Sequence, residues 1–149
     1  NEECAVCAVA EDGDMICDSF GASDLDWGWL KVQAEKEMIE AKRRRQVYLA
    51  GRDPLPIKGK VAIIVDDGVA TGLTILLAIR ELKHLHPNRI IVAVPVSSEE
   101  AAKRIRAEAD LLIALEIPPY FSSVGQHYEE FPQLSDEDVI SIMKRAGSL

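Results

Sequence analysis

The stretch VAIIVDDGVATGLT, residues 61–74, predicts both the fold of this chain and the place of its candidate site. A short apolar run typical of a buried strand ends in two adjacent aspartates, and a loop of glycine and threonine residues follows. In an open parallel α/β sheet, ligands bind at the carboxyl ends of the strands. We therefore expect Asp66 and Asp67 to lie at such an edge.

The sequence after this stretch alternates between strand and helix patterns. The apolar runs KVAIIV, RIIVAVPV and LLIALEI are nearly continuous, which is expected when both faces of a parallel sheet are covered. The chain is therefore predicted to be an α/β protein with a mostly parallel central sheet and helices on both faces. Strands are predicted at residues 60–67, 89–96 and 111–117, and helices at 72–86, 99–109 and 135–145.

Residues 1–56 show a different pattern. Two short strand-like runs, 4–10 and 14–19, flank a turn signal at Gly13, which predicts a hairpin. Helical spacing of apolar residues then predicts a helix over 24–48, with Ser23 as its N-cap and Gly51 as its end.

The helix contains the basic run KRRR, residues 42–45. We interpret this run as a solvated face, and a role in steering anions stays open. Residues 1–149 are predicted to form a single domain, in which 57–149 is the ligand-binding core and C-terminal segment.

Composition excludes several classes of function. The net charge of −8 argues against a nucleic-acid-binding surface, and no apolar run is long enough to span a membrane. A soluble, cytoplasmic protein is expected. The three cysteines, Cys4, Cys7 and Cys17, lack a second ligand pair at zinc spacing, so we expect ordinary buried thiols rather than a structural zinc or a disulfide framework.

The loop after the aspartates has the chemistry of a phosphate site. Gly68 and Gly72 allow close backbone approach, so several N–H groups can converge on one anion at a helix N-terminus, and Thr71 and Thr74 add hydroxyl donors. Carboxylates repel phosphate, but they accept hydrogen bonds from vicinal hydroxyls or help to hold a divalent cation. A phosphate at one end and a diol in the middle describe a ribose 5-phosphate. The lysine of the nucleotide-binding P-loop pattern G-x-x-x-x-G-K-[ST] is absent, which argues against a P-loop nucleotide site.

This motif resembles the phosphoribosyl pyrophosphate (PRPP) signature of type I phosphoribosyltransferases. The resemblance implies that Asp66 and Asp67 are the catalytic pair, binding the ribose hydroxyls and indirectly a Mg²⁺ ion that bridges pyrophosphate and ribose oxygens. It also implies that the loop wraps the 5′-phosphate. The loop residues in question are Gly68, Val69, Ala70, Thr71, Gly72 and Thr74.

The similarity extends to a group of bacterial and archaeal predicted phosphoribosyltransferases. It includes AVAEDGDMI, PLPIKGKVAIIVDDGVATG, AVPVSS and PPYFSSVGQHYEEFPQLSDEDV. In better-known relatives the segment that resembles YFSSVG covers the nucleobase, which makes Tyr120, Phe121 and Val124 candidates for contact with the base. Simple packing after Pro118 and Pro119 is the alternative for the two aromatic residues.

Three departures from the family pattern bear on function. Relatives usually open with a strand and a pyrophosphate-binding loop ahead of the region where this sequence begins, so we expect a truncated form, a fragment or a member that has lost this part. Ala70 stands where 6-oxopurine enzymes have an aspartate, whereas adenine and uracil enzymes have alanine. Leu73 stands where a smaller residue is commoner.

The sequence thus predicts transfer of a phosphoribosyl group from PRPP to an unidentified nucleobase-like acceptor, with Mg²⁺ as cofactor. Two other classes stay open: a non-catalytic module that binds PRPP or a nucleotide, and a structural domain with a vestigial loop. No nucleic-acid or membrane partner is expected, and a homodimer is one option for the assembly.

Overall fold

The computed structural model describes residues 6–18 and 26–147. Cys4 and the predicted N-cap Ser23 lie outside this part of the chain. The described elements, in chain order, are β1 (Cys7–Val9), β2 (Met15–Cys17), α1 (Trp27–Leu49), β3 (Val61–Val65), α2 (Leu73–His84), β4 (Arg89–Val96), α3 (Glu99–Glu108), β5 (Leu111–Glu116), the 3-10 turn η1 (Gly125–His127) and α4 (Asp136–Arg145).

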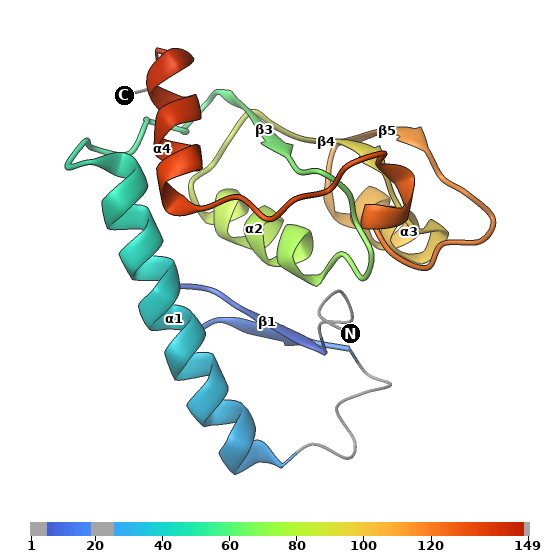
Figure 1. Ribbon diagram of the computed structural model, residues 1–149, viewed down its shortest axis with the longest axis horizontal. Helices are drawn as coiled ribbons and strands as arrows, with labels where there is room; N and C mark the ends of the chain where they lie inside the picture. The colour runs from blue at the N-terminus through green and yellow to red at the C-terminus, as the bar shows by residue number, and fades with distance from the viewer. Residues whose placement is uncertain (1–5, 19–25, 148–149) are drawn as a thin grey trace.

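A three-stranded parallel sheet has the order β3-β4-β5, with β4 in the centre. Val61 pairs with Arg89, and Ile91 pairs with Leu111, so the carboxyl ends of the three strands lie at one edge. Figure 1 shows this sheet above α2 and α3, with the β1–β2 hairpin on the far side of α2. The predicted α/β class, the parallel sheet and the N-terminal hairpin are confirmed.

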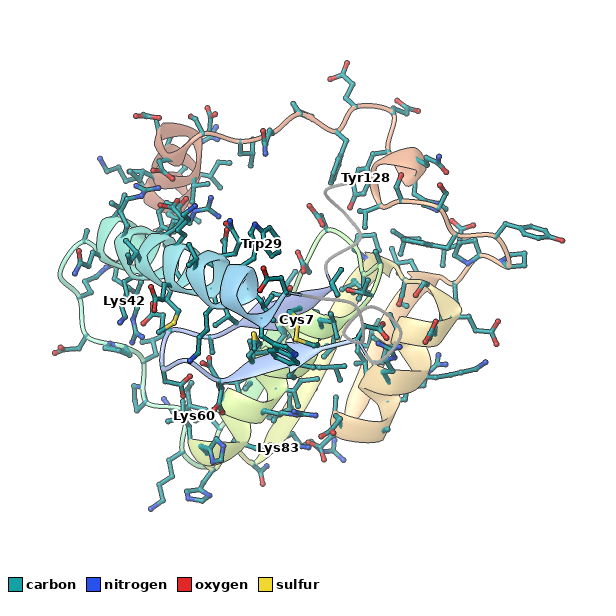
Figure 2. All side chains as sticks on the ribbon, turned by 90° about the horizontal axis from the view of Figure 1, so that it is seen from below. Cys7, Trp29, Lys42, Lys60, Lys83 and Tyr128 are labelled. Atoms are coloured by element: carbon teal, nitrogen blue, oxygen red, sulfur yellow. A yellow bond between two sulfur atoms is a disulfide. The ribbon has the colours of Figure 1, made fainter. Side chains whose placement is uncertain are left out.

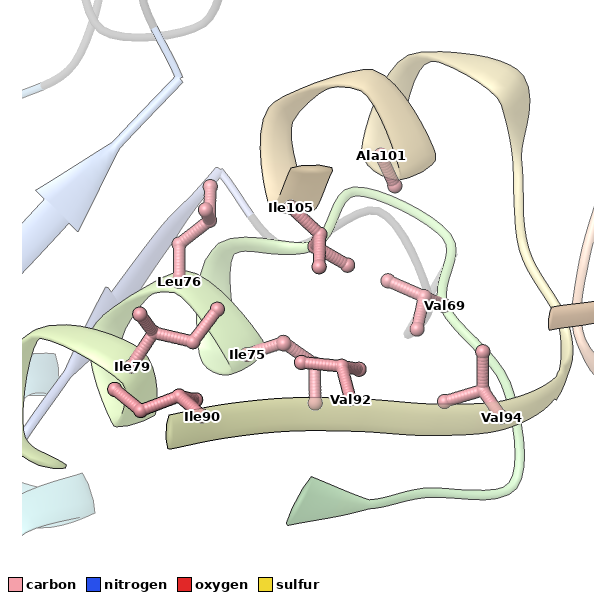
Figure 3. Packing of buried hydrophobic residues seen from close by; sticks show 9 residues of the cluster. All are labelled: Val69, Ile75, Leu76, Ile79, Ile90, Val92, Val94, Ala101 and Ile105. Atoms are coloured by element: carbon pink, nitrogen blue, oxygen red, sulfur yellow. The ribbon is translucent and has the colours of Figure 1, made fainter. Parts of the chain in front are cut away.

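The core lies between the sheet and the two crossover helices. Alternate residues of β4 point into it, and Val92, Ile79 and Ile105 are completely buried (Figure 3). Ile16 of the hairpin packs against the same cluster from the other side of α2. Burial of large aliphatic side chains contributes roughly 1.5–3 kcal/mol each, so this cluster fixes the orientation of α2 and of the loop that precedes it.

The opposite face of the sheet is apolar and exposed in the described structure. Its most exposed apolar side chains belong to the two outer strands and are 46% to 84% exposed. They are Val61, Ile63, Val65, Leu111, Ile113 and Leu115. The continuous apolar runs predicted helices on both faces of the sheet. The described helices that flank the sheet, α2 and α3, lie on one face.

The hairpin corrects one prediction. Cys7 and Cys17 are opposite each other in the antiparallel register and form a disulfide, so they are not the ordinary thiols that we expected. The residues that form the pair are ten positions apart, and only the register of the hairpin places them face to face. Disulfides are typical of oxidising compartments and rare in the reducing cytoplasm, so this one does not support the predicted cytoplasmic location, which stays a prediction.

Reduction of this disulfide is expected to lower the free energy of unfolding by about 3 kcal/mol, because the cross-link limits the entropy of the unfolded chain. Guanidinium unfolding with and without a phosphine reductant measures the difference. The double substitution C7S/C17S should remove the effect of the reductant. An unfolding midpoint that the reductant leaves unchanged in the unsubstituted protein would contradict the prediction.

Helix α1 runs along the hairpin and reaches α4 near its C-terminal end (Figure 1). Its N-cap is Asp26 and not the predicted Ser23, and the Asp26 carboxylate accepts hydrogen bonds from the amides of Gly28 and Trp29. Asp136 at the start of α4 accepts from Arg43 and from the Tyr48 hydroxyl. Part of the basic run is therefore engaged in ion pairs.

None of the described helices has both the length and the apolar composition that a membrane span needs.

Candidate phosphate and ribose site

Asp66 and Asp67 follow β3 directly, at the carboxyl edge of the sheet, as predicted. The amide of Asp67 donates a hydrogen bond to Oδ1 of Asp66 over 3.0 Å. Both residues are exposed to solvent. Two adjacent acids at this edge can therefore meet a ligand that approaches from outside the sheet.

The loop is attached to the end of β4 by its backbone. The Val69 amide donates to the Val96 carbonyl, and the Ser98 amide donates to the Val69 carbonyl, both over 2.9 Å. The side chain of Val69 is 3% exposed and belongs to the core cluster. The loop is consequently fixed at its middle, although it contains two glycines.

The amides after Val69 have no such partners. Helix α2 begins after Gly72, which lacks a side chain that could cap the first turn. The amides of residues 70–75 donate no hydrogen bond to any other residue that the structure describes. Unpaired donors and the positive end of the helix dipole make this turn suitable for an anion.

The residues that carry these amides line a small cavity of about 200 Å³. It is lined by one of the predicted aspartates, by every predicted loop residue and by one residue of the later segment. The lining residues are Asp66, Gly68, Val69, Ala70, Thr71, Gly72, Leu73, Thr74, Ile75 and Val124. Asp67 is next to this cavity but does not line it. Larger hollows of about 500 and 570 Å³ lie along α1, and no loop residue lines them.

Both loop glycines are required by their surroundings. A Cβ atom on Gly68 would lie 2.6 Å and 2.9 Å from the two γ-methyl groups of Val124 and 2.9 Å from a methyl group of Val96. Gly72 has a φ of +79°, and a Cβ there would lie 3.2 Å from Cβ of Ala101. Tight packing therefore holds the loop backbone against three other segments, the end of β4, α3 and the segment after β5.

The two aspartates do not have equivalent environments. Protein atoms around the Asp66 carboxyl partly shield it from water, and this desolvation raises its pKa above the usual value. The hydrogen bond from the Asp67 amide opposes the shift, and the negative charge of Asp67 adds to it. Without a ligand, the protein therefore favours the ionised form of Asp66 less than water does. A hydroxyl donor or a cation next to this carboxylate would favour the ionised form.

The predicted base-covering residues are separated in space. Tyr120 is 93% exposed, and the ring of Phe121 stacks on His127 with centroids 5.5 Å apart. Val124 is buried against Gly68. Of these candidates, the structure places Val124 alone at the loop cavity.

Three further residues adjoin the loop and were not singled out by sequence. Ser98 caps α3, and its hydroxyl donates a hydrogen bond to the Ala70 carbonyl over 2.6 Å, which holds this carbonyl toward α3.

The other two residues are Tyr128 and Arg104. The Tyr128 hydroxyl donates a hydrogen bond to the Asp67 carbonyl, also over 2.6 Å. Arg104, paired with Asp18, lines a hollow of about 90 Å³ on another side of Ala70 and Thr71. The capping position of Ser98 was the only available sequence signal, because the other contacts span 61 and 86 residues.

The carboxylates fit one mode of magnesium binding. Within residues 6–18 and 26–147, no three His, Cys, Asp or Glu side chains come together as a metal cage. Magnesium, however, is commonly held by one or two carboxylates together with phosphate oxygens of the ligand and waters. Asp66 and Asp67 suit that arrangement, in which the bound ligand supplies most of the oxygens.

Comparison with known proteins identifies the class. The phosphoribosyl transferase domain family matches residues 30–127, which include β3, the acidic pair, the loop and η1. The chain belongs to this family.

Individual relatives agree with this assignment. Two Mycobacterium tuberculosis proteins, from strains CDC 1551 and H37Rv, are each named "Putative phosphoribosyl transferase" and are 34% identical over 146 residues. The match covers 97% of this chain and 33% of theirs, so the chain spans about a third of the length of these relatives. The crystal structure of TT1426 from Thermus thermophilus superimposes with a TM-score of 0.72 at 34% identity, covering 97% of this chain and 69% of the other.

Proposed function

We propose that this chain contains the PRPP-binding core of a phosphoribosyltransferase that acts on a nitrogenous base. The observation that supports the proposal is the arrangement of Asp66 beside the unpaired amides of residues 70–75 around one cavity. A cavity of about 200 Å³ suits the phosphate end of the ligand, while the diol lies outside near the exposed carboxylates. The family assignment is consistent with this ligand.

In the proposed reaction, the lone pair of an acceptor nitrogen forms a bond to carbon 1 of the ribose. The bond from that carbon to the pyrophosphate oxygen breaks, and the pyrophosphate leaves with the bonding electrons. The acceptor releases the proton of its N–H group to water. Positive charge develops on the ribose, so the carboxylates of Asp66 and Asp67 stabilise it while they hold the hydroxyls. The loop amides and the hydroxyls of Thr71 and Thr74 hold the 5′-phosphate, which orients carbon 1. A magnesium ion held with Asp66 and Asp67 would neutralise charge on the leaving pyrophosphate.

Ala70 bears on the acceptor. A methyl group cannot exchange a proton with a base, so the proposed acceptor is not a 6-oxopurine that depends on an acid at this position. Among the described residues, Asp66 is the only titratable side chain that lines the loop cavity. This last observation also favours a second candidate function, a module that binds PRPP or a nucleotide without catalysis.

Calorimetry with this chain tests the proposal. Ribose 5-phosphate, PRPP with magnesium, a nucleoside monophosphate and inorganic phosphate are titrated separately, with ribose as the control. We expect the phosphorylated sugars to bind and ribose alone to give no signal. No heat with any phosphorylated sugar would overturn both functions.

A transfer assay then separates the two candidates. Release of pyrophosphate from PRPP is measured with adenine, uracil, hypoxanthine and guanine in turn. Release with one base and not with the others identifies the acceptor class. Tight binding of PRPP without release for any base would favour the binding module.

A further inference from the structure

A tyrosine far along the chain contacts the backbone at the start of the loop. The Tyr128 hydroxyl donates a hydrogen bond to the main-chain carbonyl of Asp67 over 2.6 Å, across 61 residues of sequence. Figure 2 labels Tyr128 on the segment that includes η1. This hydrogen bond is made to the peptide unit that joins Asp67 to Gly68, not to the Asp67 side chain.

The tyrosine is itself held in place by its neighbours. Its amide donates to the Gly125 carbonyl at the end of η1, and its ring packs on Phe131 with centroids 5.0 Å apart. On the other side of η1, Val124 is 7% exposed and packs against Gly68. One short segment therefore fixes two consecutive loop residues, the first by a hydrogen bond and the second by packing.

The geometry of a trans peptide gives this contact a consequence. The carbonyl of Asp67 and the amide of Gly68 belong to one planar unit and point in opposite directions. With the carbonyl directed at Tyr128, the Gly68 amide is directed away from it, and Gly68 lines the loop cavity whereas Tyr128 does not. Glycine restrains the neighbouring dihedrals less than any other residue, so without a partner this peptide could turn over. The turned peptide would direct a carbonyl oxygen, which repels phosphate, where an N–H had been.

We propose that Tyr128 is a positioning residue for the phosphate monoester: it fixes the peptide between Asp67 and Gly68 and so keeps the Gly68 amide aimed as a donor. The proposal rests on the proposed function of the same loop. Tyr128 does not touch the ligand in this role. It acts through the backbone, and its loss affects anion binding rather than recognition of the ribose hydroxyls.

The test compares Y128F with Y120F by calorimetry. Both variants lose one hydroxyl from the same segment, but Tyr120 is 93% exposed and does not line the loop cavity, and neither ligand in this test carries a base that Tyr120 could contact. We expect Y128F to weaken inorganic phosphate and ribose 5-phosphate by the same factor, roughly two- to tenfold, the usual effect of one hydrogen bond. Y120F should bind both as the unsubstituted protein does. Unchanged phosphate affinity in Y128F, with or without a lower melting temperature, overturns the proposal.

A measurement on the ligand-free protein keeps the test independent of the proposed function. In ¹⁵N relaxation-dispersion spectra, Y128F should broaden or shift the Gly68 amide signal, with Gly59 as the internal reference. The Asp67 carbonyl ¹³C shift should change at the same time. If Gly68 and Asp67 keep their signals in Y128F, the tyrosine does not restrain this peptide and the proposal fails. If the signals change but the unsubstituted protein binds no phosphate, the proposed function fails instead.

Discussion

Replacement of both aspartates, D66N/D67N, is expected to reduce affinity for ribose 5-phosphate by roughly a hundredfold or more and not to reduce affinity for inorganic phosphate, which the two carboxylates repel. A hydrogen bond to a charged acceptor contributes about 1.5–3 kcal/mol, and the double variant removes two such acceptors from the diol. The loop amides are untouched, so the anion end keeps its donors. Calorimetry with the two ligands in parallel measures the contrast.

The matched control is D53N/E116Q, which changes the net charge by the same amount. Glu116 ends β5 at the same edge of the sheet, whereas Asp53 lies in the exposed segment before β3. If this control weakens ribose 5-phosphate as much as D66N/D67N does, the carboxylates act through the general field and not by contact with the ribose. Equal loss of phosphate and ribose 5-phosphate in D66N/D67N would place the aspartates in the phosphate site, contrary to our assignment.

The pH dependence of the single variant D66N sharpens the assignment. The folded-state pKa of Asp66 is raised above the ordinary 3.8, so its stabilising contribution is present below 3.8 and is lost as pH rises through the folded pKa. At neutral pH, D66N should therefore unfold at a slightly higher denaturant concentration than the unsubstituted protein, and this difference should disappear in acid. The advantage of the aspartate in binding should fall over the same acid range, because the protonated carboxyl resembles the amide.

The second large effect is expected from G68A. The added methyl group would lie within 3 Å of three methyl carbons, so either Val124 or the loop must move. Overpacking of this kind lowers stability by about 1–3 kcal/mol. Since the amides of residues 70–75 follow immediately, displacement of the loop should also remove most of the phosphate affinity. Guanidinium unfolding and phosphate titration measure the two effects.

The double variant G68A/V124A serves as the control for this prediction. V124A removes two of the three methyl groups that lie within 3 Å of the added Cβ, so the two substitutions should partly offset each other. We expect the double variant to be more stable than the sum of the single effects predicts and to recover part of the phosphate affinity. Additive losses of stability would show that the contact between Gly68 and Val124 does not limit the loop.

Prediction from sequence succeeded where the information was local. The apolar runs placed β3, β4 and β5 within a few residues, because period and length of such runs distinguish strands from helices. Helix α4 lies within the predicted range 135–145, and Ser135 and Asp138 form a reciprocal capping box at its start. The edge position of Asp66 and Asp67 followed from the same reasoning, since the end of a strand is visible in sequence.

Prediction failed or stayed silent where residues distant in sequence meet. The hairpin was predicted, but its register was not, and this register brings Cys7 to Cys17. Turn type and loop length set the register of a hairpin, and the sequence showed a turn signal at Gly13 without defining either of them. The contact of Tyr128 with the Asp67 carbonyl had no signal of any kind, because a main-chain acceptor leaves no trace in the residue type.

For this protein the sequence by itself determined the class of fold, the acidic pair and the small, glycine-bearing loop that follows it, because strand period, helix start and loop chemistry are local properties. Only the tertiary structure decided how this loop is held: by the end of β4, by Ser98 on α3 and by Val124 and Tyr128 after β5. The physical reason is that a loop with two glycines has little conformational preference of its own. Its shape is set by contacts that chain folding brings together.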